Sequence, residues 1–504
     1  MKLKKIIENI QGVRKVEGKL TLDVKGLACD SKKVKESYLF VAIKGSRFNG
    51  ADFIDEAIER GASSIILDWN QGKGPILRKG PAYIYVDDAR AALSQGSRLF
   101  YKDLSANMYI IGITGTNGKT TATYLIESLF KKKGEETGVI GTINYRFGKR
   151  LIPSLNTTPG VLDLYTYLSN MHKEGVKNCI IEASSHSLDQ GRIDTLQFDA
   201  AIFTNLTKEH LDYHRDMDSY LASKMKLFTK IKNGGYAIIN RDDPYSGRII
   251  DRVRSDKKAN IITYGIENSR DVYASDIKSS QGGLRFTICT QKGPAKAEIE
   301  SRLIGRHNVY NILASAACGI AMGMTLEEIS SGLGEVAVLP GRLEKIDCGQ
   351  DFQVFVDYAH TEDGMENVLK ALRELNPERI LCVFGCGGDR DKSKRGPMGR
   401  ITAEISDKLF ITSDNPRSED PAEIIREIAR GIDRKDADYV IELDRYSAID
   451  KALKEARKGD IVLVAGKGHE TYQIFKDTTL PFDDREVVKK ILSEAMGYGN
   501  RKLP

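Results

Sequence analysis

The chain has 504 residues, which is enough for two to four domains, and its composition of 41% hydrophobic and 29% charged residues is typical of globular proteins. Its formal net charge is only +6, from 76 basic and 70 acidic residues, and no long basic run occurs, so nothing indicates a nucleic-acid partner. No run of roughly 18 apolar residues is present, which argues against a membrane-embedded protein. The N-terminus lacks the apolar segment of a signal peptide.

Cysteine usage indicates the compartment. The seven cysteines are scattered without paired spacing, which argues against a disulfide framework and for a reducing environment. We therefore expect a cytoplasmic protein.

Short apolar runs alternate with helical patterns along most of the chain, which predicts an α/β protein with largely parallel sheets. The runs fall into three series, so we predict three domains, at residues 1–105, 106–337 and 338–504. Strand-like runs of the third series are followed directly by Gly, Asp, His or Arg, as in DNPR (414–417) and GKGHE (466–470). Ligands bind beyond the carboxyl ends of strands in open parallel sheets, so these polar residues are candidate ligand contacts.

The clearest chemical motif is IIGITGTNGKTTATYLIESLF (110–130), which predicts a strand, a glycine-rich turn and a helix. Backbone amides of such a turn, together with Lys119, bind phosphates, and Thr120 is suited to ligate Mg²⁺. Ile113 stands where the common phosphate-loop pattern has its first glycine, which disfavours an ordinary kinase or motor ATPase.

The form TGTNGKTT (114–121) resembles the Mur ligase and folylpolyglutamate synthetase superfamily. Further motifs follow in the order expected of a Mur ligase, so the resemblance covers essentially the whole chain. These motifs are TTP (157–159), EASSHSLDQGR (182–192), TNLTKEHLDYH (204–214), SKMKLF (223–228), GRHNVYNILAS (305–315), PGRLE (340–344) and DYAHT (357–361).

Within this family, GCGGDRDKSKR (385–395), DNPR and GKGHE resemble the members that add the third peptide residue, in the form that uses meso-diaminopimelate. The resemblance implies an N-terminal uridine-nucleotide-binding α/β domain, a central P-loop ATPase-like domain with a mostly parallel sheet, and a C-terminal Rossmann-like domain. Two positions depart from the family pattern: Glu209 replaces the usual Asp, and Glu362 replaces the usual Pro.

The activity implied by the resemblance is an ATP-dependent amide-bond-forming ligation in peptidoglycan precursor synthesis. ATP would phosphorylate the terminal carboxylate of UDP-N-acetylmuramoyl-L-alanyl-D-glutamate, and the amine of diaminopimelate would attack the acyl phosphate. The implied cofactors are ATP and Mg²⁺, the partners are small-molecule substrates, and we expect a monomer. Alternatives with the same fold add L-lysine or extend folate with glutamate. A non-catalytic scaffold would be expected to lack Lys119, Glu182 or His210, and all three are present.

The family's site residues carry over to matching positions of this sequence. The implied catalytic residues are Lys119, Glu182, His210 and Lys224, with Mg²⁺ held by Thr120, Glu182 and His210. Lys224 would be carbamylated by CO₂ to N6-carboxylysine, although the residues alone predict an exposed helical lysine beside Lys226. The implied ATP contacts are Gly115, Thr116, Asn117, Gly118, Lys119, Thr120, Thr121, Asn308, Asn311, Arg342 and Asp357.

The substrate contacts divide between the outer domains and the central one. The implied UDP-muramoyl-dipeptide contacts are Ser31, Ser46, Arg47, Phe48, Thr157, Thr158, Ser184, Gln190 and Arg192. The implied diaminopimelate contacts are Arg390, Asp414, Asn415, Pro416, Arg417, Gly466 and Glu470. We expect Arg417 to pair with the far carboxylate of diaminopimelate and Glu470 with its distal ammonium. The alternative for Arg417 is a surface ion pair with Glu419 or Asp420.

The histidines allow a second metal hypothesis. His210 and His214 are four residues apart, a spacing that suits two zinc ligands on one helix face. The segment lacks the internal Glu of HExxH and an evident third ligand, so magnesium through His210 and packing for His214 are favoured. We expect His186 and His360 to line the site and His172 to lie on the surface.

Overall fold

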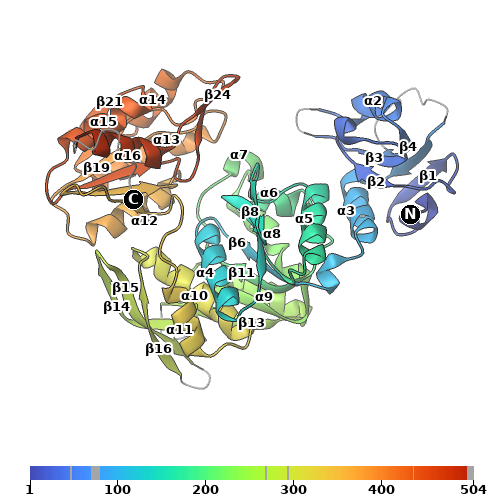
Figure 1. Ribbon diagram of the computed structural model, residues 1–504, viewed down its shortest axis with the longest axis horizontal. Helices are drawn as coiled ribbons and strands as arrows, with labels where there is room; N and C mark the ends of the chain where they lie inside the picture. Colours follow the sequence, from blue (N-terminus) through green and yellow to red (C-terminus); the bar gives the residue numbers. More distant parts are fainter. Residues whose placement is uncertain (46–47, 70–79, 267–269, 292–294, 435, 496–504) are drawn as a thin grey trace.

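The computed structural model describes residues 1–45, 48–69, 80–266, 270–291, 295–434 and 436–495. It contains three α/β domains, each built on its own sheet, with the central domain between the other two (Figure 1). The predicted fold class is confirmed. Within the described ranges, no helix is long and apolar enough to cross a membrane.

The N-terminal domain has a five-stranded sheet in the order β1-β5-β4-β3-β2, parallel except for β1 at one edge. Its buried strands are rich in Ile, Val, Leu and Ala, which explains their continuous apolar runs. The strands are β1 (Val13–Glu17), β2 (Gly26–Ala28), β3 (Tyr38–Ala42), β4 (Ala62–Asp68) and β5 (Ala82–Val86), and the helices are α1 (Leu3–Ile7), α2 (Ile54–Glu59) and α3 (Ala89–Phe100).

The central domain has an eleven-stranded sheet in the order β16-β15-β14-β13-β12-β11-β6-β10-β7-β8-β9. Its middle strands are parallel, and an antiparallel extension stands at each end. The parallel strands are β6 (Tyr109–Thr114), β7 (Thr137–Ile140), β10 (Asn178–Glu182), β11 (Phe198–Phe203), β12 (Ile231–Asn240), β13 (Asn260–Gly265) and β14 (Val272–Ser280). The extensions add β8 (Asn144–Phe147), β9 (Arg150–Pro153), β15 (Gly283–Thr290) and β16 (Lys296–Ser301).

Helices cover both faces of this sheet. One face carries α4 (Lys119–Lys132), α10 (Arg306–Ala321) and α11 (Leu326–Gly334), whose apolar residues share one buried cluster. The opposite side carries α5 (Val161–Lys173), α6 (Ser185–Asp189), α8 (Met217–Met225) and α9 (Ser246–Asp256), and the short α7 (Leu211–His214) precedes α8. Leu125, Ile126, Leu129 and Phe130 of α4 are all buried, as their spacing predicts.

The C-terminal domain has a six-stranded sheet in the order β17-β18-β22-β19-β20-β21, parallel except for β17, and a separate hairpin. The strands are β17 (Glu344–Ile346), β18 (Gln353–Asp357), β19 (Ile380–Phe384), β20 (Lys408–Ile411), β21 (Asp438–Ile441) and β22 (Ile461–Ala465), and the hairpin is β23 (Tyr472–Phe475) with β24 (Thr478–Pro481). One face is covered by α12 (Glu362–Arg373), α13 (Arg395–Ile405) and α14 (Pro421–Ala429), the other by α15 (Arg445–Glu455) and α16 (Asp484–Ala495).

The two domain junctions differ in chemistry. A single apolar cluster runs from the N-terminal domain through α3 and Met108 into the central domain. Towards the C-terminal domain, Ile304 is the central-domain member of the described apolar cluster beneath α12. The remaining contacts across this second junction include hydrogen bonds, such as Asn117 Nδ2 to Asp363 Oδ2 at 2.6 Å.

A buried ion pair joins the last helix, α16, to α15 and to the end of strand β22. Arg445 on α15 donates to both carboxylate oxygens of Asp484 on α16, at 2.8 and 2.7 Å, and both side chains are 0% exposed. Arg445 also donates to the carbonyl oxygen of Ala465, at the end of β22, at 2.9 Å. The pair therefore fixes the strand end from which GKGHE begins.

Replacing Arg445 with Met should destabilise the C-terminal domain. The change leaves Asp484 as a buried carboxylate without its partner, a loss that costs about 3–5 kcal/mol in comparable pairs. Urea unfolding should show a lower midpoint, and Arg445→Met/Asp484→Leu should recover part of the loss because neither charge remains. Unchanged stability of Arg445→Met would contradict this account.

Candidate active site

A cavity of about 1100 Å³ lies between the central and C-terminal domains. Its lining residues follow the carboxyl ends of β6, β11 and β12 in the central sheet and of β18, β19, β20 and β22 in the C-terminal sheet. Two sheets thus contribute their ligand-binding edges to one space. Most of the residues predicted for ATP and for the amino acid line it.

The glycine-rich turn at 115–118 requires its glycines for steric reasons. Gly115 has a φ of 153° and Gly118 a φ of 84°, conformations that side chains disfavour. A Cβ at Gly115 would lie 1.8 Å from Thr204 Oγ1, and one at Gly118 would lie 2.2 Å from Asn311 Oδ1. Helix α4 begins directly after the turn, at Lys119, and its first residues line the cavity. The free N–H groups of this helix end are therefore available to a ligand in the cavity.

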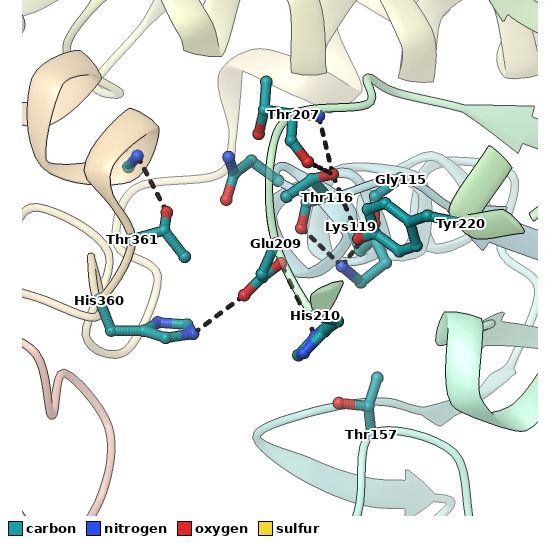
Figure 2. Close-up of polar contacts among 12 residues, drawn as sticks. Gly115, Thr116, Lys119, Thr157, Thr207, Glu209, His210, Tyr220, His360 and Thr361 are labelled. Atoms are coloured by element: carbon teal, nitrogen blue, oxygen red, sulfur yellow. Dashed lines mark hydrogen bonds and ion pairs between the residues drawn. The ribbon is translucent and has the colours of Figure 1, made fainter. Parts of the chain in front are cut away.

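Two lysines converge on the backbone of this turn. Lys119 Nζ donates to the carbonyl oxygens of Gly115 and Thr116, each at 2.8 Å (Figure 2), and Lys224 Nζ donates to Gly115 O at 2.8 Å. Burial lowers the pKa of Lys119, and burial together with the charge of Lys119 lowers the pKa of Lys224 well below its usual value. Lys224 is 1% exposed, so the exposed helical lysine expected from the residues alone is wrong.

Glu182 lies at the end of β10 and is held by hydroxyl groups. Its Oε2 accepts hydrogen bonds from Thr120 Oγ1 at 3.0 Å and from Thr142 Oγ1 at 2.7 Å. Arg342, from beyond the domain junction, reaches Thr120 Oγ1 at 3.5 Å. Hard oxygen donors are therefore gathered beside the phosphate loop, as a Mg²⁺ site requires.

Glu209 bridges the two domains. Its carboxylate lies 3.7 Å from His210 Nε2 and 3.4 Å from His360 Nε2, and His360 belongs to the C-terminal domain (Figure 2). Although burial opposes ionisation of Glu209, its contacts with His360, His210 and Lys119 hold its pKa well below the usual range. His360 Nδ1 in turn lies 2.8 Å from Tyr358 O, so both ring nitrogens face acceptors. Glu209 thus forms the bridge at the position where the family usually has Asp.

The second departure is equally compatible with the fold. Thr361 caps α12 by accepting a hydrogen bond from Gly364 N, and Glu362 occupies the first position of the helix. Pro suits this position because its missing N–H is unpaired there, and an acidic residue suits it because of the helix dipole. Glu362 also pairs with Arg400 at 2.6 Å.

Three histidines cluster beside Lys224. The His186 ring centroid lies 4.8 Å from that of His210 and 5.6 Å from that of His214, and His214 packs on Tyr220 at 5.0 Å. His214 is buried, as expected of a packing residue, whereas His172 is exposed on α5. Among the residues that the structure describes, no group of three His, Cys, Asp or Glu side chains is arranged to hold a metal ion.

The residues predicted for ATP, except Gly115, line the same cavity. Asn308 and Asn311 on α10 are buried and joined by a hydrogen bond of 2.9 Å. Arg342 lies over the Tyr358 ring at 4.6 Å, and Asp357 accepts from the backbone N–H groups of Leu343 and Ala359 at 2.6 and 2.7 Å. Both carboxylate oxygens of Asp357 therefore accept hydrogen bonds from the backbone at the domain junction.

The predicted UDP-muramoyl-dipeptide residues are divided. Thr157, Ser184 and Arg192 line the cavity. Thr158 and Gln190 are not among its lining residues but contact Arg192, which donates to Thr158 O at 2.7 Å and to Gln190 Oε1 at 2.6 Å. The structure does not bring Ser31 or Phe48 to this cavity, because both lie in the N-terminal domain. Ser31 donates to Glu56 at 2.7 Å, Phe48 is exposed, and Ser46 and Arg47 lie outside the described residues.

The predicted amino-acid residues converge from three strand ends. Arg390, Asp414, Asn415, Arg417, Gly466 and Glu470 all line the cavity, whereas Pro416, between Asn415 and Arg417, is not among its lining residues. Arg417 donates to Gly388 O at 2.7 Å, and no ion pair of Arg417 occurs among the described side chains. Glu419 instead pairs with Arg395 and Lys392, so the alternative of a surface pair for Arg417 is wrong.

Sequence reasoning missed several residues that shape the site. Asp363 accepts a hydrogen bond from Asn117 of the phosphate loop, and Arg395, which is 1% exposed, joins Glu419 to Gly387 O. Lys467 is fully buried beside Glu470. Arg395 lies in the motif GCGGDRDKSKR and Lys467 in GKGHE. From sequence alone, a charged residue is expected on the surface unless the partners that would bury it are known.

Models of three Mur ligase domains match the chain. The Mur ligase family catalytic domain matches residues 23–101, the Mur ligase middle domain residues 113–319, and the Mur ligase glutamate ligase domain residues 341–468. The chain belongs to the Mur ligase family.

Full-length relatives are similar over nearly the whole Mur ligase chain. The UDP-N-acetylmuramoyl-L-alanyl-D-glutamate–2,6-diaminopimelate ligase of Caldanaerobacter subterraneus is 42% identical, covering 97% of this chain and 99% of its own. The ligases of the same name from Solibacter usitatus and Geobacter sulfurreducens are 43% and 44% identical, covering 99% and 94% of this chain and 99% and 95% of their own.

Solved structures share the fold. A structure of a diaminopimelate ligase of the same name has a TM-score of 0.67 at 29% identity, covering 98% of this chain and 99% of its own. The MurF ligase of Thermotoga maritima in complex with ADP has a TM-score of 0.64 at 20% identity, covering 94% and 98%, and supports the fold alone.

Replacing His214 with Phe should flatten the pH dependence of stability. Burial lowers the pKa of His214 to about 4. Between this value and the ordinary pKa near 6.5, the unfolded chain binds more protons, so stability is full above that range and falls as pH drops through it. Thermal unfolding at pH 7 and pH 5 should differ less in His214→Phe than in wild type. His172→Phe, on the exposed side of α5, is the matched control, and equal slopes in all three proteins would contradict the prediction.

Proposed function

We propose that the chain is an ATP-dependent ligase that adds meso-diaminopimelate to UDP-N-acetylmuramoyl-L-alanyl-D-glutamate. The observation that carries the proposal is that one cavity joins the phosphate loop to the DNPR and GKGHE loops. A phosphoryl donor and an incoming amine are thereby brought to the same space, which an acyl-phosphate mechanism requires. The names of the full-length relatives support this substrate pair.

Phosphoryl transfer depends on positioning and charge neutralisation. In this proposal Lys119 and the N-terminus of α4 bind the β- and γ-phosphates, and Arg342 adds a cation from the C-terminal domain. The convergence of Lys119, Thr120 and Arg342 at the turn supports this assignment. Thr120 and Glu182 offer adjacent hard oxygen atoms, so these two residues fit Mg²⁺, and the family resemblance adds His210 as a further ligand. The ion would neutralise phosphate charge; His210 and Glu182 would hold it.

Lys224 fits carbamylation. CO₂ reacts with the neutral amine: the nitrogen lone pair forms an N–C bond, one C=O pair moves to oxygen, and the nitrogen loses a proton to give a carbamate. Burial favours the neutral amine, because it lowers the pKa of Lys224. The product would be an anion near the phosphate loop, suited to a second Mg²⁺.

The amino-acid end supports diaminopimelate over L-lysine. Arg417 and Arg390 line the cavity, and neither has a carboxylate partner among the described ion pairs. A second substrate carboxylate would supply that partner, whereas lysine would leave the guanidinium groups unpaired. Folylpolyglutamate synthase structures are 16% identical and share the fold alone.

The cellular setting is part of the same proposal. ATP and nucleotide-linked precursors are cytoplasmic substrates, and the seven cysteines are all free, as in a reducing compartment. We propose a monomer, a proposal supported by the fact that both lysines, Glu182 and the amino-acid loops of one chain line or adjoin the same cavity.

Incubation with ATP, Mg²⁺ and UDP-muramoyl-dipeptide should yield the tripeptide product with diaminopimelate and far less with L-lysine. Mass spectrometry of the product and phosphate release measure both. Equal use of L-lysine would refute the substrate assignment.

Lys119→Ala should lose ~10²–10³-fold or more in kcat, because an electrostatic group at the phosphates is removed while the backbone amides remain. A near-normal kcat in this variant would refute the role of the phosphate loop.

Lys224→Ala should be inactive and partly rescued by added acetate or formate. The small carboxylate would occupy the space of the carbamate and restore its negative charge. Lys226→Ala is the matched control, because Lys226 is exposed and pairs with Asp189 on the surface. Full activity of Lys224→Ala, or equal loss in both variants, would rule out the carbamate.

A further inference from the structure

Lys467 is fully buried beside the part of the cavity that is lined by the DNPR and GKGHE loops. Strand β22 ends at Ala465, and Lys467 stands between Gly466 and Gly468, with φ values of 109° and 52°. A Cβ at Gly466 would lie 2.9 Å from Asp414 Oδ2, and one at Gly468 would lie 2.7 Å from Tyr358 Cβ. This tight turn, closed by a hydrogen bond from Glu470 N to Lys467 O at 2.9 Å, leaves Lys467 0% exposed.

The ammonium group of Lys467 belongs to a closed set of three side chains. It donates to Glu470 Oε2 and to Asn415 Oδ1, each at 3.2 Å, and Asn415 Nδ2 donates to Glu470 Oε2 at 2.8 Å. Asn415 Oδ1 also accepts from Ile474 N at 3.0 Å, which fixes the orientation of the amide. Among the described contacts, both side-chain hydrogen bonds to Glu470 reach Oε2, so Oε1 is the oxygen left for a ligand.

The charge of this set bears on which amino acid fits. Glu470 and Asp414 bring two negative charges to the end of the cavity where Arg390 and Arg417 bring two positive charges. Without a cation behind it, Glu470 would attract a lysine side chain and repel a substrate with an additional carboxylate. Lys467 offsets the charge of Glu470 at 3.2 Å from a fully buried position, where salt and water screen the interaction much less than at the surface.

We propose that Lys467 is a positioning residue that orients Glu470 and Asn415 and, by offsetting the charge of Glu470, favours an amino-acid substrate with a second carboxylate. This inference rests on the proposed function and refines it. It assigns the side chain of Asn415 to the support of Glu470. It also gives a buried charge within GKGHE a role in selecting diaminopimelate over lysine.

Lys467→Met keeps an unbranched side chain, one heavy atom shorter than lysine, and removes its charge and its donors. We expect the KM for diaminopimelate to rise about 10- to 100-fold, because Glu470 loses one of its two hydrogen bonds and the charge that fixes it. The preference for diaminopimelate over L-lysine should narrow, while the KM values for ATP and UDP-muramoyl-dipeptide and the kcat at saturation change little. Lys467→Gln, which retains a donor, is measured in parallel, so that a folding defect in one variant leaves the other as the test.

A double-mutant cycle separates action through Glu470 from a general effect on the domain. If Lys467 acts through Glu470, Lys467→Met/Glu470→Gln should raise the KM much less than the product of the two single effects. Lys454→Met is the matched control: this lysine is 73% exposed on α15 and pairs with Asp450, so its variant should behave as wild type.

Two failures are distinguishable. Absence of wild-type turnover with diaminopimelate would overturn the proposed function and this inference with it. Wild-type turnover combined with an unchanged KM and an unchanged preference in folded Lys467→Met and Lys467→Gln would overturn the inference alone. Multiplicative effects in the double-mutant cycle would also overturn it, because Lys467 would then not act through Glu470.

Discussion

The meeting of two parallel sheet edges is the constraint on which the rest of this structure depends. The carboxyl ends of β6 and β11 face the same cavity as those of β18, β20 and β22. Each edge alone is an ordinary ligand-binding edge; together they bring a phosphate-binding turn and an amino-acid site into one space. The phosphate loop, the contact of Glu209 with His360, and the DNPR and GKGHE loops are therefore parts of one site. This site is complete only while both domains are in contact.

The two junctions of the central domain suit different tasks. An apolar cluster continues from the N-terminal domain into the central sheet, so relative movement there would expose buried hydrophobic surface to water. The C-terminal junction depends more on polar contacts, such as Asn117 with Asp363 and Glu209 with His360. Water can replace such contacts at low cost, so this junction is suited to open for substrates and to close around a reactive acyl phosphate.

The fold could be predicted because its signals are local. The apolar run that opens the phosphate-loop motif became β6, and the strand-like run directly before GKGHE became β22, since a strand buried on both faces is apolar throughout. The phosphate loop was equally visible, because its glycines, Lys119 and Thr120 follow one another directly between an apolar run and a helical pattern. The side chains that make Gly115 and Gly118 necessary, Thr204 and Asn311, are distant in sequence and were not predicted to lie there. The resemblance to a family then indicated Lys224, whose burial no local pattern predicts: its partner, Gly115 O, lies 109 residues away in sequence.

Buried charges are the part of the site that the sequence does not reveal. Asn415 and Glu470 are 55 residues apart, and Arg395 and Glu419 are 24 apart, so neither pairing follows from a helical or strand period. A Lys or Arg becomes fully buried only where its partners are already fixed, and those partners come from different strand ends. The same three strand ends also form the amino-acid site. Buried cations beside a site for a charged substrate set the net charge that the substrate encounters. The protein can thus adjust this charge without changing the charged residues on its exposed surface.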